Sequence, residues 1–236
     1  LTHEGALFLT DAQLILKTAL SAKERLGSHE NFISLELGCH NYMELNLFPP
    51  VLKKLSQEFP LVRPNIRLVP FPSLLSMIEN NQVQAALGVK NDQKPSPLLF
   101  RELCSAPVAC VCSPDHPLAQ YKSLTKRELT GNFIACSPRQ ISDSLFTIQN
   151  NILVNLLPGQ RFFAENVESA FALAKALLGY TLYPDIPPAR DTGLCYIPVT
   201  DLPRISFGIY YQYGLDQPVL KRFLTLISGY MKEAQA

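Results

Sequence analysis

The chain has 236 residues, of which 47% are hydrophobic, and this is enough to build the cores of two small domains. Its 21 basic and 20 acidic side chains give a formal net charge of +1, which argues against a nucleic-acid-binding domain that stands alone. No apolar run reaches the roughly 18 residues that a membrane span needs, and the amphipathic first 30 residues do not have the pattern of a signal peptide. We therefore expect no membrane partner.

Six cysteines are too few and too scattered for the disulfide framework of a small secreted protein. Several of them stand in apolar sequence, where a free cysteine behaves as a small hydrophobic side chain. The chain is therefore expected to be reduced and cytoplasmic. The cysteines are Cys39, Cys104, Cys110, Cys112, Cys136 and Cys195.

The first predicted element is a helix over residues 6–26. Its leucines, among them Leu7, Leu14 and Leu26, recur at the spacing of one helix face. Such a stripe is wider than a solvated monomeric helix should expose, so we expect it to pack on another surface, such as a second copy of the chain. Residues 27–31 then read as a helix stop and a short hinge.

A strand–helix alternation begins at Ser34 and continues to Val89. It predicts strands over 34–38, 67–70 and 84–89, with helices up to Phe59 and over 73–81. This order is typical of a parallel sheet with crossover helices, in which ligands bind beyond the carboxyl ends of the strands. The polar turn from Gly38 to Tyr42 lies at such an end.

The alternation returns in the second half of the chain. We expect strands over 106–112, 132–136 and 180–183, and helices over 123–129, 143–157 and 166–178. Two more strands, over 194–199 and 205–211, and a helix over 218–234 close the chain. This order predicts an α/β protein of two similar lobes with a ligand cleft between them.

Several short motifs, in their order and spacing, make the chain resemble the C-terminal part of a LysR-type transcriptional regulator. The motifs are Leu1-Thr-His-Glu-Gly5, Gly38 to Pro49, Leu103 with Pro107-Val108, Ser113-Pro-Asp-His-Pro-Leu-Ala119, and Ala174 to Pro184. Two positions depart from the family pattern: Asn81-Gln-Val-Gln84 stands where Gly-x-x-Asp is usual, and Leu177 stands where glycine is usual.

The resemblance implies two Rossmann-like lobes of periplasmic-binding-protein type II architecture, preceded by a long linker helix. In this division, residues 1–30 form the linker helix and hinge. Residues 31–103 plus 201–236 form regulatory lobe I, and residues 104–200 form lobe II. The resemblance also implies a small-molecule effector, a homodimer or homotetramer, and DNA binding through an N-terminal winged helix-turn-helix domain, most of which is absent from this chain.

The first group of candidate effector-binding residues is Cys39, His40, Asn41 and Tyr42, at the end of the first strand. Backbone amides of this turn and of the next helix favour an anion, so we expect an anionic effector such as an organic or amino acid. The family usually has Ser or Thr at the position that we align to His40. A histidine there predicts pH-dependent recognition. The alternative is an ordinary polar turn.

The second group lies around the same predicted cleft, and the resemblance implies its role. Helix capping is the competing explanation for Ser73 and Asn166, since both stand at predicted helix starts. The residues are Pro72, Ser73, Ser137, Pro138, Phe163, Asn166 and Tyr183.

Other site chemistries receive little support. Cys104, Cys110, Cys112 and His116 lack the usual zinc spacing, and Cys110 and Cys112 alternate on one strand face, as core residues do. Among the thiols, Cys39 is the best candidate for redox sensing, because its turn should be accessible. Neither a Gly-x-Ser-x-Gly elbow nor a nucleotide-binding glycine motif occurs. We therefore expect no metal, no cofactor and no enzyme activity.

Two rival functions share the predicted architecture. One is a periplasmic-type solute-binding receptor without a DNA function, which would have no use for the leucine-striped helix over 6–26. The other is an oligomerisation scaffold with an empty cleft, for which no ligand would shift the melting temperature.

Overall fold

The computed structural model describes residues 32–90, 97–138, 140–212 and 217–234, together with scattered positions among the first 19. Every described position from Gly5 to Ala19 is helical. Most of the predicted linker helix, and the whole of the hinge over 27–31, lie outside the described residues. Four large apolar side chains among the described positions of the first 19 residues are well exposed: Phe8, Leu9, Ile15 and Leu16.

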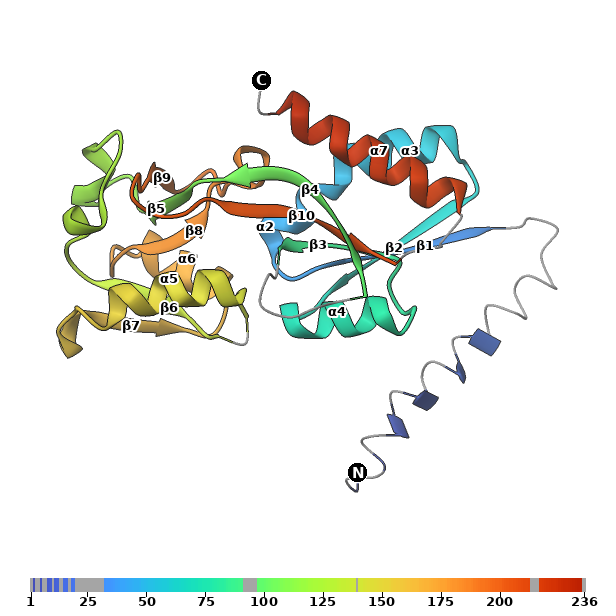
Figure 1. The fold of residues 1–236 in the computed structure, drawn as a ribbon, viewed down its shortest axis with the longest axis horizontal. Coiled ribbons are helices and arrows are strands. Elements are labelled where there is room, and N and C mark those ends of the chain that lie inside the picture. Colours follow the sequence, from blue (N-terminus) through green and yellow to red (C-terminus); the bar gives the residue numbers. More distant parts are fainter. Residues whose placement is uncertain are drawn as a thin grey trace.

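The protein has two lobes, and the first is built on a five-stranded sheet (Figure 1). Its strand order is β2-β1-β3-β10-β4, with β1, β2 and β3 parallel and β10 antiparallel to both of its neighbours. This confirms the predicted parallel unit and its crossover helices, although β2 begins at Val62 and not at the predicted Arg67. The strands are β1 (Ile33–Cys39), β2 (Val62–Leu68), β3 (Ala85–Val89), β4 (Leu99–Ala106) and β10 (Ile205–Tyr211).

Helices cover both faces of the lobe I sheet. Helices α3 (Phe48–Glu58) and α7 (Pro218–Glu233) pack side by side on one face, and α4 (Phe71–Glu79) lies on the other (Figure 1). Helix α4 approaches β1 closely, because a Cβ atom on Gly38 would lie 2.3 Å from Leu74 Cδ2. A glycine at the end of β1 therefore lets the helix sit directly on the strand.

The second lobe contains one antiparallel and one parallel ladder. Strand β5 lies between β8 and β9 and is antiparallel to both, whereas β6 and β7 are parallel. Helices α5 and α6 pack against these strands. The two lobes therefore share the α/β class but not the same strand directions. The elements are β5 (Val108–Cys112), β6 (Phe133–Cys136), α5 (Asp143–Leu153), β7 (Arg161–Ala164), α6 (Val167–Lys175), β8 (Thr181–Pro184) and β9 (Cys195–Pro198).

Short helices connect the longer elements. Helix α2 (Tyr42–Leu45) follows β1, and four 3-10 turns lie in lobe II: Pro117–Gln120, Lys126–Glu128, Pro158–Gln160 and Pro187–Ala189. The helix predicted over 123–129 is only the second of these turns. At its start, Thr125 donates both its backbone N–H and its hydroxyl to the Glu128 carboxylate.

Three predicted helices have different ends in the structure. The helix predicted over 73–81 begins at Phe71. Pro70 and Pro72 are tolerated there, because the backbone N–H groups of the first helical turn have no acceptor within the helix and proline lacks this N–H. The helices predicted over 143–157 and 166–178 end at Leu153 and Lys175. The capping role predicted for Asn166 is confirmed, since its Oδ1 accepts the backbone N–H of Ser169 at 2.8 Å.

The two departures from the family pattern have a structural counterpart. Asn81 and Leu177 have φ values of 56° and 60°, in the left-handed region that favours glycine. Gln84, where the family usually has Asp, accepts the backbone N–H of Glu36 at 2.8 Å and ties β1 to the start of β3.

Candidate functional site

The site is built on the turn between β1 and α2, at the carboxyl edge of the lobe I sheet. Asn41 caps α2, because its Oδ1 accepts the backbone N–H of Glu44 at 2.9 Å. The cap holds the Asn41 amide in the interior, where the residue is only 1% exposed. The sequence therefore places a buried, rigid polar group at the end of the first strand.

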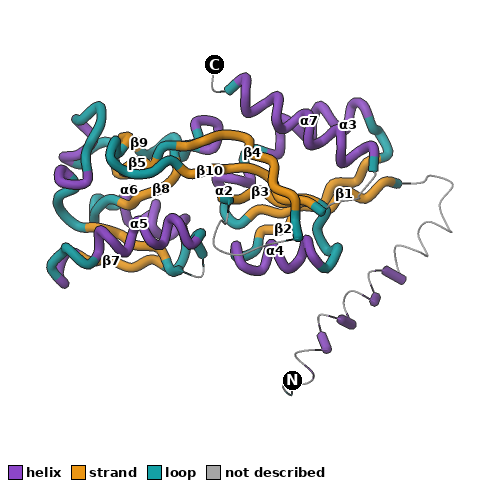
Figure 2. The backbone as a smooth tube through the Cα atoms, viewed as in Figure 1, coloured by secondary structure: helices purple, strands orange, loops and turns teal. Residues whose placement is uncertain are grey.

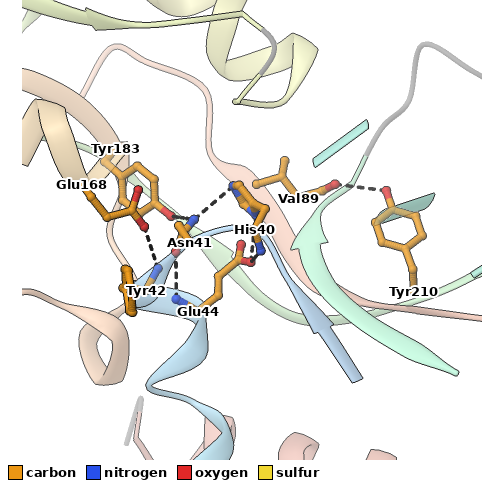
Figure 3. Close-up of polar contacts among 8 residues, drawn as sticks. All are labelled: His40, Asn41, Tyr42, Glu44, Val89, Glu168, Tyr183 and Tyr210. Atoms are coloured by element: carbon orange, nitrogen blue, oxygen red, sulfur yellow. Dashed lines mark hydrogen bonds and ion pairs between the residues drawn. The ribbon is translucent and has the colours of Figure 1, made fainter. Parts of the chain in front are cut away.

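His40 and Glu44 form a buried pair beside Asn41 (Figure 3). The Glu44 carboxylate accepts the backbone N–H of His40 at 3.0 Å and lies 2.8 Å from His40 Nδ1. The other ring nitrogen, Nε2, lies 3.0 Å from the Asn41 amide nitrogen. Since an amide N–H can only donate, these contacts fit an imidazole that carries its proton on Nδ1 and accepts at Nε2.

Two hydrogen bonds join this turn to lobe II (Figure 3). The Asn41 amide donates to the Tyr183 hydroxyl on β8 at 2.8 Å. The backbone N–H of Tyr42 donates to the Glu168 carboxylate, in the first turn of α6, also at 2.8 Å. The turn after β1 is thus a point where lobe I and lobe II are in direct contact.

Tyr183 is held inside lobe II by its aromatic neighbour. The Phe171 and Tyr183 rings form a T-shaped pair, with ring centroids 5.6 Å apart. Burial, and then the nearby negative charge of Glu44, raise the pKa of Tyr183 well above its usual value. The hydroxyl is therefore neutral and serves as a hydrogen-bond partner only.

The expectation that Cys39 is accessible is wrong. Its side chain is fully buried, on the same face of β1 as Leu35 and Leu37. Burial, together with the negative charges of Glu44 and Glu168, raises the pKa of the Cys39 thiol. The residue is therefore a protonated core side chain, and it loses its place as the best candidate for redox sensing.

Pro72 and Ser73 lie exposed in the first turn of α4. Their neighbour Phe71 touches the site, because its ring meets the His40 ring edge-on at a centroid distance of 5.4 Å. The alternative role of Ser73 as a helix cap is wrong, since Pro70 occupies the cap position. Pro72 and Ser73 thus stand beside the His40 turn on the lobe I side.

The other candidates of lobe II lie after β6, on β7 and at the start of α6. Ser137 and Pro138 follow β6, and Phe163 on β7 is 71% exposed. The Asn166 side chain is engaged in its helix cap. Among the described residues, no hydrogen bond joins these four residues to the turn over 40–42, so their role as effector contacts stays a prediction.

Two residues of the site were not predicted: Glu44 and Glu168. Glu44 is 1% exposed, and no lysine or arginine of the described residues pairs with it or with Glu168. The Asn41-x-x-Glu44 spacing is the capping-box pattern, which could have indicated a glutamate turned back onto the turn. No comparable local signal indicated Glu168, because its partner lies in the other lobe.

No three of the described His, Cys, Asp and Glu residues come together in a way that could hold a metal ion. Cys110 and Cys112 are fully buried, which confirms the prediction that they belong to the core. Within the described part of the chain, no helix is both long and apolar enough to cross a membrane.

The two-lobe fold and the polar turn between its lobes define a class of ligand-binding domains, and the sequence places the chain in it. Residues 33–232 match the model of the LysR substrate binding domain, so the chain belongs to this family. The family consists of domains of transcriptional regulators rather than of enzymes, and a ligand-binding regulatory role follows from this membership.

Two full-length regulators are similar over nearly the whole chain. The Hca operon transcriptional activator HcaR of Escherichia coli (strain K12) is 29% identical over 96% of this chain and 78% of its own length. The uncharacterized HTH-type transcriptional regulator YybE of Bacillus subtilis (strain 168) is 24% identical over 99% of the chain and 81% of its own length.

Solved structures of regulators share the fold. The effector binding domain of BenM with its effector benzoate has a TM-score of 0.67 and 17% identity, over 86% of this chain and 93% of that domain. A full-length OxyR variant from Pseudomonas aeruginosa has a TM-score of 0.65 and 17% identity, over 96% of this chain and 80% of its own. The predicted two-lobe α/β architecture is thereby confirmed.

Proposed function

We propose that the chain is the effector-sensing and oligomerisation region of a LysR-type regulator, with its effector bound between the lobes at the turn over residues 40–42. The observation that carries the proposal is the pair of hydrogen bonds from this turn to Tyr183 and Glu168 in lobe II. A ligand that replaces or rearranges these bonds binds with a different free energy to different arrangements of the lobes. Such a difference is what allows a ligand to shift the protein from one arrangement to another.

The proposed effector is a small anion, such as an organic or amino acid. The backbone N–H of Tyr42 already holds a carboxylate, that of Glu168, at 2.8 Å. This contact supports a carboxylate as a fitting partner, and it means that an anionic effector has to displace the protein's own Glu168. Both ring nitrogens of His40 are engaged, by Glu44 and by Asn41, so we propose that His40 supports the shape of the turn that receives the effector.

The remaining parts of the proposal concern the assembly. We place lobe I at residues 31–103 plus 201–236 and lobe II at 104–200, with a linker helix and hinge over 1–30. The regulator is proposed to be cytoplasmic, to form a homodimer or homotetramer, and to bind DNA through its N-terminal domain. Effector binding would change the geometry of the oligomer and so the placement of the DNA-binding domains.

A thermal-shift screen of this chain against a panel of small metabolites tests the proposal. A hit is then titrated by calorimetry into wild type, His40→Ala, Ser137→Ala and the control Ser228→Ala, which changes a residue of α7 outside the site. We expect weaker binding in the first two variants and unchanged binding in the control. Wild-type affinity in both site variants, or no hit across a broad panel, would reject the proposed site.

A further inference from the structure

Two cysteines of lobe II stand opposite each other on neighbouring strands. Cys112 is the last residue of β5 and Cys195 is the first residue of β9, and they are register partners in this antiparallel ladder. Directly opposite residues of such a ladder point to the same face. The sequence alone did not predict this pair, because the two thiols are far apart in the chain and their pairing depends on the direction in which β9 returns.

The ladder brings the two backbones to a distance that a disulfide can span. The backbone N–H of Val199 donates to the Val108 carbonyl oxygen at 2.9 Å, so these two residues form a hydrogen-bonded pair of the ladder. Hydrogen-bonded pairs recur at every second residue of an antiparallel ladder. Cys112 and Cys195, each four residues away on its strand, therefore form a pair of the same type. Such pairs have Cα atoms about 5.5 Å apart, within the range of disulfides. Their Cβ atoms, about 5 Å apart, must approach by about 1 Å. A bond formed there is strained and readily reduced.

The position at the end of the ladder makes this approach feasible. Strand β5 ends at Cys112, with the Ser113 turn after it, and β9 begins at Cys195. No further rung of the ladder has to be broken when the two residues draw together. The strain therefore falls on two strand ends and not on the middle of the sheet.

A third thiol, that of Cys110, influences the reactivity of Cys112. Cys110 and Cys112 are two residues apart on β5, and the interaction of their thiols raises the pKa of Cys110 and lowers that of Cys112, whereas burial raises the pKa of Cys195. Cys195 is the partly exposed member of the three, whereas Cys110 and Cys112 are fully buried. Reagents thus reach Cys195 first. Cys112, the thiol whose pKa is lowered, lies opposite it on the neighbouring strand.

We propose that Cys112 and Cys195 form a reversible disulfide by exchange with a low-molecular-weight disulfide. The Cys195 thiolate attacks one sulfur of the reagent, whose S–S bond breaks, and one small thiol leaves with a proton. The Cys112 thiolate then attacks the Cys195 sulfur of this mixed disulfide, and the second small thiol leaves. Two protein thiols are oxidised, and one reagent disulfide is reduced to two thiols. This proposal does not depend on the effector site.

Oxidised glutathione is the probe for this proposal. The folded chain is incubated with it, alkylated, digested without reduction and mapped by mass spectrometry. We expect a peptide that joins Cys112 to Cys195, and its loss after dithiothreitol. Cys112→Ala should stop at glutathione on Cys195, Cys195→Ser should give no cross-link, and Cys136→Ser, a buried control on β6, should behave as wild type.

Circular dichroism of each variant, before and after oxidation, establishes that the reaction occurs in the folded chain. Cys110→Ala gives a further variant, in which the cross-link should form several-fold more slowly because the interaction that lowers the pKa of Cys112 is removed. Glutathione that stays on Cys195 in wild type, a cross-link that appears only in denaturant, or no reaction at all would each overturn the proposal.

Discussion

Leu177 is a non-glycine residue in a backbone conformation that suits glycine. Its φ of 60° follows directly on the end of α6, and its side chain is half exposed. The left-handed conformation costs an L-residue with a Cβ about 1–2 kcal/mol. The structure thus explains why a glycine is usual at this position of the family pattern, and it identifies a local site of strain.

Replacing Leu177 by glycine should therefore stabilise the protein. We expect a gain of about 1 kcal/mol, since relief of the strain exceeds the loss of a half-exposed side chain and of chain entropy. For a chain of this size the melting temperature should rise by about 2–4 °C in differential scanning calorimetry.

The matched control is Ala176→Gly, one residue earlier. Ala176 has a φ of −78°, which alanine adopts without strain, so glycine there only increases the entropy of the unfolded chain. This variant should melt at a lower temperature than wild type. If both substitutions shift the melting temperature in the same direction, the argument from φ is wrong.

At the scale of elements, the turn after β5 shows how a short motif folds. His116 caps the 3-10 turn Pro117–Gln120, because its Nδ1 accepts the backbone N–H of Leu118 at 3.1 Å. A ring nitrogen can accept only when it carries no proton. Burial also lowers the pKa of His116 below its usual value of 6.5. The folded turn therefore requires neutral histidine.

This predicts a pH dependence of stability. Because the folded state binds the His116 proton less tightly than the unfolded chain, the contribution is complete above pH 6.5 and is lost as the pH falls from there toward the lower, folded pKa. His116→Asn, whose side-chain oxygen can accept the same N–H, should flatten this part of the profile. Urea unfolding between pH 5 and 8 measures the effect.

The comparison at pH 8 is the internal control for this experiment, since His116 is neutral there in both the folded and the unfolded chain. The free energies of unfolding of the variant and of wild type should then differ by a constant amount at high pH. At low pH this difference should become smaller or change sign. Parallel profiles over the whole range would show that His116 does not set the pH response.

The elements also show what local sequence could and could not predict. The strands around the first turn, and the Asn166 cap, follow from periodicity and capping chemistry, which are local. The burial of Cys39 was equally local, because it continues the alternation of Leu35 and Leu37, and the prediction failed by treating it as part of the turn. The pairing of Cys112 with Cys195 depends on strand register, which no local pattern contains.

At the scale of the whole molecule, two unpredicted carboxylates shape the contact between the lobes. Glu44 accepts from the His40 amide and Glu168 from the Tyr42 amide, so two backbone donors of one turn are each engaged by a glutamate. The Glu168 bond crosses from lobe II to lobe I. An effector carboxylate at this turn must compete with it and also experiences its negative charge.

Glu168→Gln should therefore strengthen the binding of an anionic effector, by about tenfold if the repulsion removed is worth about 1.4 kcal/mol. The glutamine oxygen can still accept the Tyr42 N–H, so the lobes keep their contact. Calorimetric titration of the hit from the metabolite screen measures the change.

The control for this prediction is Glu165→Gln, which removes an equal charge from an exposed position three residues earlier. It should change affinity little, because solvent screens a charge that does not touch the turn. Equal affinities in wild type and Glu168→Gln would show that Glu168 does not oppose the ligand.

The two lobes are connected by strands that are themselves hydrogen-bonded partners. Strand β4 passes into β5 through the single residue Pro107, and β9 returns to β10 beside it, with Ala106 paired to Ile205 and Val199 bonded to Val108 (Figure 2). A ribbon of two bonded strands flexes out of its own plane far more easily than within it. We expect movement between the lobes to take place mainly by bending of this ribbon out of its plane. If a ligand binds between the lobes, as proposed, we expect it to act on this bend, whatever its chemistry.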